Sequence, residues 1–262
     1  MGLNFMIYAA VYCHMGRGRK NNEDNFYLNG LWKPRDRANR NRLEGISVPQ
    51  PALFAVFDGM GGEQYGEVAS ATAAALLHDH RDVFLTGPDP ENVGTERISQ
   101  LSRALWQSCK ESGCRMGTTL AAAAVRDRDL YLFGLGDSRI YLLENGKLTQ
   151  VTRDHTVAAE TAYSALSGEQ AHASKNFGSN QLTQYFGMDC SEYDASPCHS
   201  RYPLRRDMKL LLCSDGLYDA LEEAEIADIL TKSIPMVAVQ RLIDLALDRN
   251  AKDNITAMVL AV

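Results

Sequence analysis

The stretch from Thr118 to Thr152 constrains the fold more than any other part of the sequence, because short apolar runs alternate there with turn residues. One run turns back at Asp127–Asp129, and the last two runs are joined by Asn145-Gly146. An Asn-Gly pair between apolar runs is the strongest short-range signal for a β-hairpin. This part of the chain is therefore predicted to form consecutive antiparallel strands.

Apolar runs and helical spacing define the remaining elements. Further strands are predicted at Phe5–His14, Asn25–Leu31, Ala52–Phe57, Met208–Cys213 and Ile255–Val262. Helices are predicted at Gly66–His78, Thr95–Glu111, Glu222–Leu230 and Val237–Arg249. Strands run together between helix pairs, which favours an α+β layered domain with largely antiparallel sheets. A chain of 262 residues is near the upper limit for one hydrophobic core, which allows one domain or two small ones.

The stretch 32–51 interrupts this pattern. Arg, Asn and Pro dominate it, and no hydrophobic period persists, so we predict a loop insertion. The stretch is longer and more basic than a connecting loop needs. That composition fits either a partner-binding segment or a solvated loop, and the solvated loop is the favoured interpretation.

Composition and charge exclude several classes of protein. The formal net charge of −6 argues against a nucleic-acid binder, whose usual surface is basic. The six cysteines form no C-x-x-C pair, so a structural zinc site is not expected. No apolar run approaches the ~20 residues that span a bilayer, and no secretory signal is seen, so neither membrane insertion nor secretion is expected. Reduced thiols in the cytoplasm are the simplest interpretation.

Acidic residues recur at the ends of the predicted strands. Asp58, Asp137, Asp215 and Asp253 each lie beside an apolar run, and the pair Glu23-Asp24 precedes another. Carboxylates that converge at one end of a sheet repel each other unless cations lie between them. Carboxylate and carbonyl oxygens are the ligands of hard ions, so magnesium or manganese is predicted.

Each acidic motif also has a simpler explanation. An isolated Asp-Gly is more often a turn than a metal ligand. Asp137 alone could cap a turn, and Asp253 alone could belong to a loop before a strand. Because DGMGG, GDSR, SDG and DN all adjoin apolar runs, the set as a whole indicates a metal site. Arg19 on its own would be taken as a solvated charge, since Arg17 and Lys20 are its neighbours.

The order and spacing of these motifs resemble the bacterial form of the metal-dependent protein serine/threonine phosphatases of the protein phosphatase 2C type, the PPM family. The matching segments are GRGRKNNED (16–24), FAVFDGMGG (54–62), GTTLAAAAV (117–125), GLGDSRIYLLENGKLTQVTRDHT (134–156), LSGEQAHASKNFGSNQLTQYFG (166–187), LLLCSDGLYDAL (210–221) and DNITAMVLAV (253–262). The resemblance covers nearly the whole chain. It implies one catalytic domain over 1–262, a four-layer α-β-β-α sandwich of two mainly antiparallel sheets flanked by helices, and a flap over 158–180.

The resemblance also implies two core metal ions, Mn²⁺ or Mg²⁺. Asp58 would bridge the ions, and the carbonyl of Gly59 would complete the shell of one of them. Asp215 and Asp253 would hold the other. The ions would acidify a bridging water, so that hydroxide attacks phosphorus near neutral pH.

Four further positions match the family less directly. Glu23 and Asp24 would act mostly through metal-bound water, and Asp137 matches the ligand of a third, weaker ion. Arg19 matches the arginine that binds the substrate phosphate, where its planar fork suits two oxygens. Eukaryotic relatives often carry a histidine where this chain has Met60, so the proton donor for the leaving group stays unassigned. Water on the Asp137 ion is our hypothesis for that donor.

The predicted partners are phosphorylated proteins and a cognate serine/threonine kinase, and a monomer is expected. Two alternatives stay open: a pseudophosphatase that acts as a binding module, and a phosphohydrolase for small phosphoesters. Outside the acidic motifs, His155 is expected to have a hydrogen-bonded structural role. Cys213 is expected to be a buried packing residue.

Overall fold

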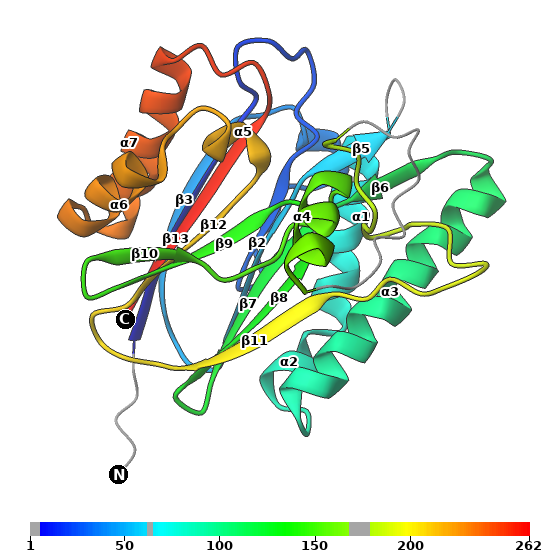
Figure 1. The fold of residues 1–262 in the computed structure, drawn as a ribbon, viewed down its shortest axis with the longest axis horizontal. Helices are drawn as coiled ribbons and strands as arrows, with labels where there is room; N and C mark the ends of the chain where they lie inside the picture. Colours follow the sequence, from blue (N-terminus) through cyan, green and yellow to red (C-terminus); the bar gives the residue numbers. More distant parts are fainter. Residues whose placement is uncertain (1–5, 62–64, 168–178) are drawn as a thin grey trace.

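The computed structural model describes residues 6–61, 65–167 and 179–262 (Figure 1). Its strands are β1 (Met6–His14), β2 (Asn25–Leu28), β3 (Arg42–Pro49), β4 (Ala52–Phe57), β5 (Gly59–Gly61), β6 (Met116–Thr118), β7 (Leu120–Arg126), β8 (Asp129–Leu135), β9 (Arg139–Glu144), β10 (Lys147–Gln150), β11 (Cys198–Pro203), β12 (Lys209–Cys213) and β13 (Ile255–Ala261). Its helices are η1 (Arg35–Arg37), α1 (Gly66–Asp79), α2 (Arg81–Leu85), α3 (Pro90–Ser112), α4 (Val157–Ser167), α5 (Asp215–Tyr218), α6 (Glu223–Lys232) and α7 (Pro235–Asp248).

Two antiparallel sheets form the centre of the fold. Within the described residues, one sheet has the strand order β10-β9-β12-β13-β1-β3 and the other has the order β11-β8-β7-β4-β2. A short pair, β5 and β6, adjoins them. Helices α6 and α7 lie on one side of the sheets, and α1, α2 and α3 lie on the other (Figure 1). The predicted α+β class is therefore confirmed.

Three apolar clusters of described residues hold these layers together. One lies between the two sheets and joins residues such as Val11 and Met258 of one sheet to Phe54 and Leu132 of the other. The second packs α1 and α3 onto the five-stranded sheet, and the third packs α6 and α7 onto the six-stranded sheet. Central strands are consequently buried on both faces: all six residues of β4 (ALFAVF) are buried. Burying apolar area on this scale stabilises the strands whose ends carry polar groups.

The Asn-Gly hairpin forms as expected, whereas one helix start differs from the prediction. Asn145 and Gly146 both have positive φ (52° and 76°), the conformation that a tight hairpin requires. Helix α3 begins earlier than predicted, at Pro90. Proline is tolerated at the first helical position, and the Asp89 side chain accepts a hydrogen bond from the Asn92 amide. The residues from Pro90 to Gly94 thus belong to the helix.

The prediction of a loop over 32–51 is wrong for its second half. Residues Arg42–Pro49 form β3, which pairs with β1 along its length at the edge of the six-stranded sheet. Exposed and half-buried residues alternate along β3, as in a strand, but polar residues occur on both faces. Arg42 and Glu44 point to the less exposed face and form an ion pair with 2.8 Å between Nε and Oε1. This mixed pattern hides the period from a search for alternating hydrophobic residues.

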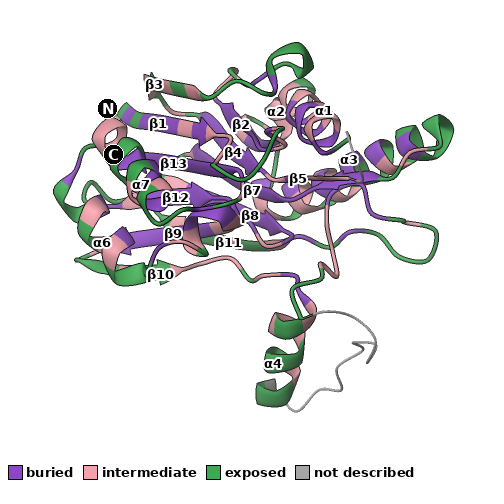
Figure 2. Cartoon of the chain, turned by 90° about the horizontal axis from the view of Figure 1, so that it is seen from above, coloured by how far each residue is buried: buried purple, intermediate pink, exposed green. Residues whose placement is uncertain are grey.

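The predicted flap at 158–180 is described only in part. Helix α4 (Val157–Ser167) forms its beginning, and it extends away from the body of the molecule (Figure 2). Residues 168–178 lie outside the described part of the chain. Among the described residues, none of the helices combines the length and the apolar character that crossing a bilayer requires.

Candidate active site

The acidic residues of the sequence motifs converge at one end of the two sheets. Asp58 directly follows β4, and Asp215 begins α5 just after β12, so each sheet contributes one of them. Asp253 lies just before β13, and Asp24 just before β2. These segments enclose a pocket of about 300 Å³, which we call the acidic pocket. Its lining includes every predicted site residue except Asp24: Arg19, Glu23, Asp58, Gly59, Asp137, Asp215 and Asp253.

Asp58 is held firmly in this pocket. Its amide donates to the Thr119 hydroxyl at 2.9 Å, and the Thr118 hydroxyl donates to its carbonyl at 2.9 Å. Burial, and then the carboxylates around it, raise the pKa of Asp58 well above its usual value; the neighbours are Asp24, Asp215, Asp137 and Asp253. Five acids that influence one another in this way are a site where cations would relieve strong repulsion.

Asp24 lies beneath the pocket rather than in its lining. The residue is 1% exposed, and its Oδ2 accepts hydrogen bonds from the hydroxyls of Ser214 and Thr256, both at 2.7 Å. Burial raises its pKa, while these two hydrogen bonds act in the opposite direction. Its other oxygen, Oδ1, is buried and has no hydrogen-bond partner. A buried carboxylate oxygen without a donor is costly unless something positive satisfies it.

Asp215 also has a carboxylate oxygen without a hydrogen-bond partner. Its Oδ1 is buried without a hydrogen-bond partner, and burial followed by the Asp253 charge raises its pKa. Two orphaned carboxylate oxygens in an acidic cluster fit a hard divalent ion. Within the described residues, no three Asp, Glu, His or Cys side chains are already arranged around one ion position. An ion here would therefore complete its shell with carbonyl oxygens and water, as magnesium commonly does.

Two glycines let the loops of the acidic pocket approach each other. A Cβ on Gly59 would lie 2.2 Å from the Gly66 carbonyl oxygen and 2.5 Å from that of Glu23. A Cβ on Gly66 would lie 2.6 Å from Cδ of Glu23. The Gly59 amide also donates to the Glu23 carbonyl at 3.2 Å. Backbone packing this close has no room for a side chain, so the glycines in DGMGG and in YGEV have a steric role.

Arg19 lies at the mouth of the pocket and contacts an acid there. Its Nη2 is 2.6 Å from Oδ2 of Asp253, and the two side chains are 53% and 39% exposed. Arg19 is thus half exposed and paired with an acid of the pocket.

Asn254 is a site residue that the sequence analysis quoted in a motif but gave no role. Its Nδ2 donates to the carbonyls of Met15 and Asn21 at 2.8 and 2.9 Å, and its Oδ1 accepts from the Glu23 amide at 2.8 Å. One side chain thus fastens the loop that carries Arg19 to the start of β13. An Asn beside a predicted metal ligand, just before a buried strand, was the available signal.

The sequence matches the family described as Protein phosphatase 2C over residues 14–255. The chain belongs to this family. The match includes the loop of Arg19, the four aspartate motifs and the start of β13. The family prediction is therefore confirmed.

Named relatives agree with this family assignment. The serine/threonine phosphatase stp of Listeria welshimeri serovar 6b is 32% identical over 97% of this chain and 95% of its own length. The serine/threonine protein phosphatase PstP of Mycobacterium tuberculosis is 31% identical over 98% of this chain, which spans 45% of that relative. The crystal structure of M. tuberculosis PstP/Ppp has a TM-score of 0.76 at 29% identity and covers 98% of this chain and 99% of its own. A structure of the PstP catalytic domain in complex with two manganese ions has a TM-score of 0.74 at 28% identity, covering 98% and 99%.

In this phosphatase 2C domain, Asp137 is anchored by an aromatic and a basic residue. Tyr218 donates its hydroxyl to the Asp137 carbonyl at 3.0 Å, and the Arg139 guanidinium stacks 3.6 Å from the centre of the Tyr218 ring. Arg139 also pairs with Asp154 at 2.7 Å. Burial, followed by the charges of Asp215 and Asp154, raises the pKa of Asp137 to about 7. The network explains why GDSR and SDGLY lie together, although the sequence analysis assigned Tyr218 no role.

Asp219 is a further acid that the sequence analysis missed. It lies one helical turn after Asp215. The charge of Asp219 contributes to raising the pKa of Asp215, and the charge of Asp253 contributes to raising the pKa of Asp219. Burial is the first cause of the shift in both residues. Asp219 and Asp253 share the lining of a second cavity of about 330 Å³ beside the acidic pocket. The i, i+4 spacing in SDGLYD was the signal.

The two structural expectations are confirmed. His155 is 7% exposed, its Nδ1 accepts a hydrogen bond from the Gly136 amide at 3.1 Å, and its own amide donates to the Gly136 carbonyl at 2.9 Å. Burial lowers the pKa of this histidine, so it is a neutral brace behind Asp137. Cys213 is fully buried in the cluster beneath α7, and burial raises its thiol pKa.

Proposed function

We propose that this chain is an active metal-dependent phosphatase that hydrolyses phosphoserine and phosphothreonine in proteins, a phosphoric monoester hydrolase. The convergence of acids on Asp58 carries the proposal, because carboxylates this close repel one another unless cations lie among them, and cations are what phosphoryl transfer needs. The names of the relatives support the substrate class.

The residues that would hold two core ions are Asp58, Asp215, Asp253 and the carbonyl of Gly59. When bound, Mn²⁺ or Mg²⁺ would acidify water and offset charge on the phosphoryl oxygens. The two hydroxyl donors to Asp24 fix that carboxylate below the pocket, where it adds negative potential without occupying the substrate space. The solved relative with two manganese ions favours manganese.

Arg19 would orient the phosphoryl group. Its guanidinium is half exposed at the pocket mouth and has only Asp253 as a charged partner within ion-pair distance among the described residues. A planar fork in this position can exchange one carboxylate contact for two phosphoryl oxygens. Met60 lines the same pocket and has no titratable proton, so the leaving oxygen must obtain its proton from elsewhere.

The alternatives are less well supported. A pseudophosphatase would be expected to have lost acids of the site, yet all of those predicted are present and gathered. A small-phosphoester hydrolase would need groups that enclose the rest of its substrate, whereas five of the twelve residues that line the acidic pocket are Asp or Glu. A third ion at Asp137, a kinase partner, a cytoplasmic location and a monomeric state remain predictions.

The test is a substrate comparison with metal titration. Wild-type protein would be assayed with a phosphothreonine peptide, p-nitrophenyl phosphate and nucleotides over a range of Mn²⁺ and Mg²⁺. We expect metal-dependent release of phosphate, with the peptide preferred over nucleotides. Strict inactivity with metal bound would favour the binding module, and preference for a nucleotide would favour the small-phosphoester enzyme.

A further inference from the structure

Exposed cations gather on two neighbouring loops of the molecule. Lys20 lies in the loop between β1 and β2, and Arg35, Arg37 and Arg40 lie between β2 and β3. All four side chains belong to exposed residues. We call them the basic rim. The chain has a net charge of −6, so a local excess of cations is not what its composition would produce on average.

Hydrogen bonds tie the basic rim to the acidic pocket. The Asn39 side chain accepts from the Asn22 amide at 3.1 Å, and the Asn41 side chain accepts from the Met15 amide at 2.9 Å. Both amides belong to the loop that carries Arg19, which lines the pocket. The segment that carries the rim arginines is therefore hydrogen-bonded to the loop at the pocket mouth.

A buried lysine anchors the same segment from inside. Lys33 is 1% exposed, and its ammonium donates to the Ala38 carbonyl at 2.8 Å. Its backbone forms two hydrogen bonds with the Asn25 side chain, at 3.0 and 2.9 Å, directly after Asp24. The three arginines are thus presented on a fixed turn, not on a loose loop, which lowers the entropy cost of binding through them.

Two acids lie near the rim, and one of them pairs with a rim arginine. Asp36 lies 3.8 Å from Arg37, and Glu67 accepts from the Asn21 side chain at 2.8 Å. Across the described residues, no ion pair involves Lys20, Arg35 or Arg40. At least three positive charges are left to attract a partner.

We propose that the basic rim binds acidic side chains that flank the phosphorylated residue of a protein substrate. This inference rests on the proposed function and specifies its substrate class. A phosphoryl group at the pocket places the neighbouring residues of its chain over the mouth, within reach of cations on the adjoining loops. Exposed cations of this kind steer an acidic segment and fix its orientation. Neutral peptides, which lack flanking carboxylates, gain nothing from the rim.

Matched phosphothreonine peptides provide the test. One peptide carries Asp and Glu on both sides of the phosphorylated residue, and the other carries Asn and Gln at the same positions. We expect wild type to favour the acidic peptide in kcat/KM by about fivefold, given the modest value of exposed ion pairs, and to lose that preference in high salt. The double variant Arg35→Gln/Arg40→Gln is expected to abolish most of the preference and to leave the neutral peptide and p-nitrophenyl phosphate within twofold.

A control variant separates the rim from net charge. Lys147→Gln/Lys232→Gln removes the same two charges from exposed residues on β10 and α6, and it should keep the preference for the acidic peptide. The inference is overturned if wild type hydrolyses the two peptides equally well, or if the arginine variant keeps the preference. In either case, hydrolysis of the peptides would still support the proposed phosphatase activity. Weaker binding of the arginine variant to RNA or anionic vesicles, with the peptide preference unchanged, also counts against the inference. Failure of wild type to hydrolyse any phosphopeptide would refute the proposed function as well.

Discussion

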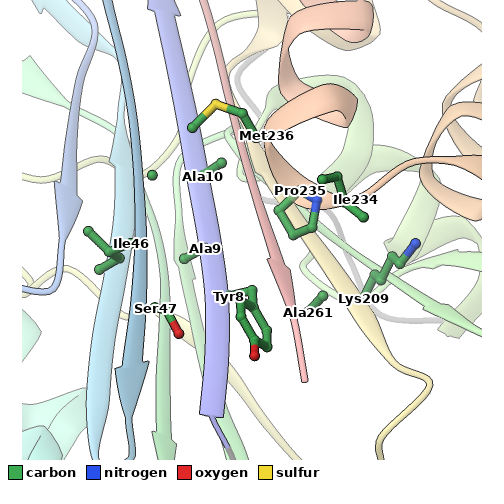
Figure 3. Close-up of a pocket in the computed structure, with 11 residues that line it drawn as sticks. Tyr8, Ala9, Ala10, Ile46, Ser47, Lys209, Ile234, Pro235, Met236 and Ala261 are labelled. Carbon is green, nitrogen blue, oxygen red and sulfur yellow. The ribbon is translucent and has the colours of Figure 1, made fainter.

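The acidic pocket and a larger apolar pocket differ in whether their polar groups have hydrogen-bond partners. The apolar pocket has a volume of about 600 Å³ and lies between β1, β3 and the start of α7, with Tyr8, Ile46 and Met236 in its lining (Figure 3). The amine of Lys209 in its lining donates to the carbonyls of Leu230 and Ser233 at 2.6 and 2.9 Å. The acidic pocket is half as large, yet burial and then neighbouring carboxylates raise the pKa of Asp58 in its lining. Oδ1 of Asp215 and, beneath the pocket, Oδ1 of Asp24 have no hydrogen-bond partner.

Size and apolar lining, which are the usual first guides to a ligand site, point to the wrong cavity for chemistry in this molecule. Unsatisfied and mutually repelling polar groups point to the right one. The comparison predicts that changes in the acidic pocket alter activity and metal-linked stability, whereas comparable changes in the apolar pocket do not.

The largest effect is expected for Asp58→Asn. Loss of one negative charge from the centre of the cluster should weaken metal binding and reduce kcat/KM on a phosphothreonine peptide by about 10³-fold. A steady-state assay at saturating Mn²⁺ measures the change. Ile234→Ser, in the lining of the apolar pocket, is the matched control and should stay within twofold of wild type. Equal losses in the two variants would erase the distinction between the pockets.

The second effect is on stability as a function of pH. The folded pKa of Asp137, about 7, lies above the ordinary value of 3.8, and the buried Asp24 shifts in the same direction. Such groups stabilise the fold fully below their unfolded pKa and lose that contribution as pH rises through the folded pKa. Metal-free protein should therefore lose roughly 2–4 kcal/mol of unfolding free energy between pH 5 and pH 8. Urea unfolding with a chelator measures this, and added Mn²⁺ should reverse the trend. A metal-free protein that is more stable at pH 8 would contradict the account.

The third effect is expected for a glycine of the acidic pocket, and a glycine of the apolar pocket provides the comparison below. Gly59→Ala forces a methyl group against two backbone carbonyls at 2.2 and 2.5 Å, so the loops of the acidic pocket must separate. We expect a cost of about 1–3 kcal/mol in unfolding free energy and at least tenfold weaker Mn²⁺ binding. Thermal unfolding and calorimetry measure the two. Tight metal binding in this variant would show that the close approach of Gly59 and Glu23 is unimportant.

The smallest effect is expected for Gly45→Ala in the apolar pocket. A Cβ there would lie 2.4 Å from Cε of Met236, which is the end of a flexible side chain and can move aside. The unfolding free energy should change by less than about 0.5 kcal/mol, and activity should be unchanged. A large loss of activity in Gly45→Ala would show that the apolar pocket is coupled to catalysis.

The sequence predicted the elements and site residues whose signal lies within a few neighbouring residues. Asp58 and Asp215 follow continuous apolar runs, and a carboxylate at the end of a buried strand is visible without a structure. The Asn145-Gly146 hairpin is a two-residue signal. β3 failed as a prediction because its alternation is carried by Arg, Glu, Gly and Ser as much as by apolar residues.

Long-range contacts could not be predicted. The hydroxyls that hold Asp24 come from Ser214 and Thr256, residues about two hundred positions away, and nothing in SDG or DNIT specifies their partner. The same applies to Asn254, which binds a loop at the other end of the chain. Such pairings follow from strand order, which the sequence analysis did not assign.

Calorimetric titration of Mn²⁺ into metal-free wild type and Asp58→Asn at pH 7.5 tests the central claim most directly. The account predicts saturable binding of about two ions to wild type, with proton release from the buried carboxyls, and at least tenfold weaker binding to the variant. Equal Mn²⁺ binding by the two proteins, or no saturable binding by wild type, would contradict the assignment of the acidic pocket as the metal centre.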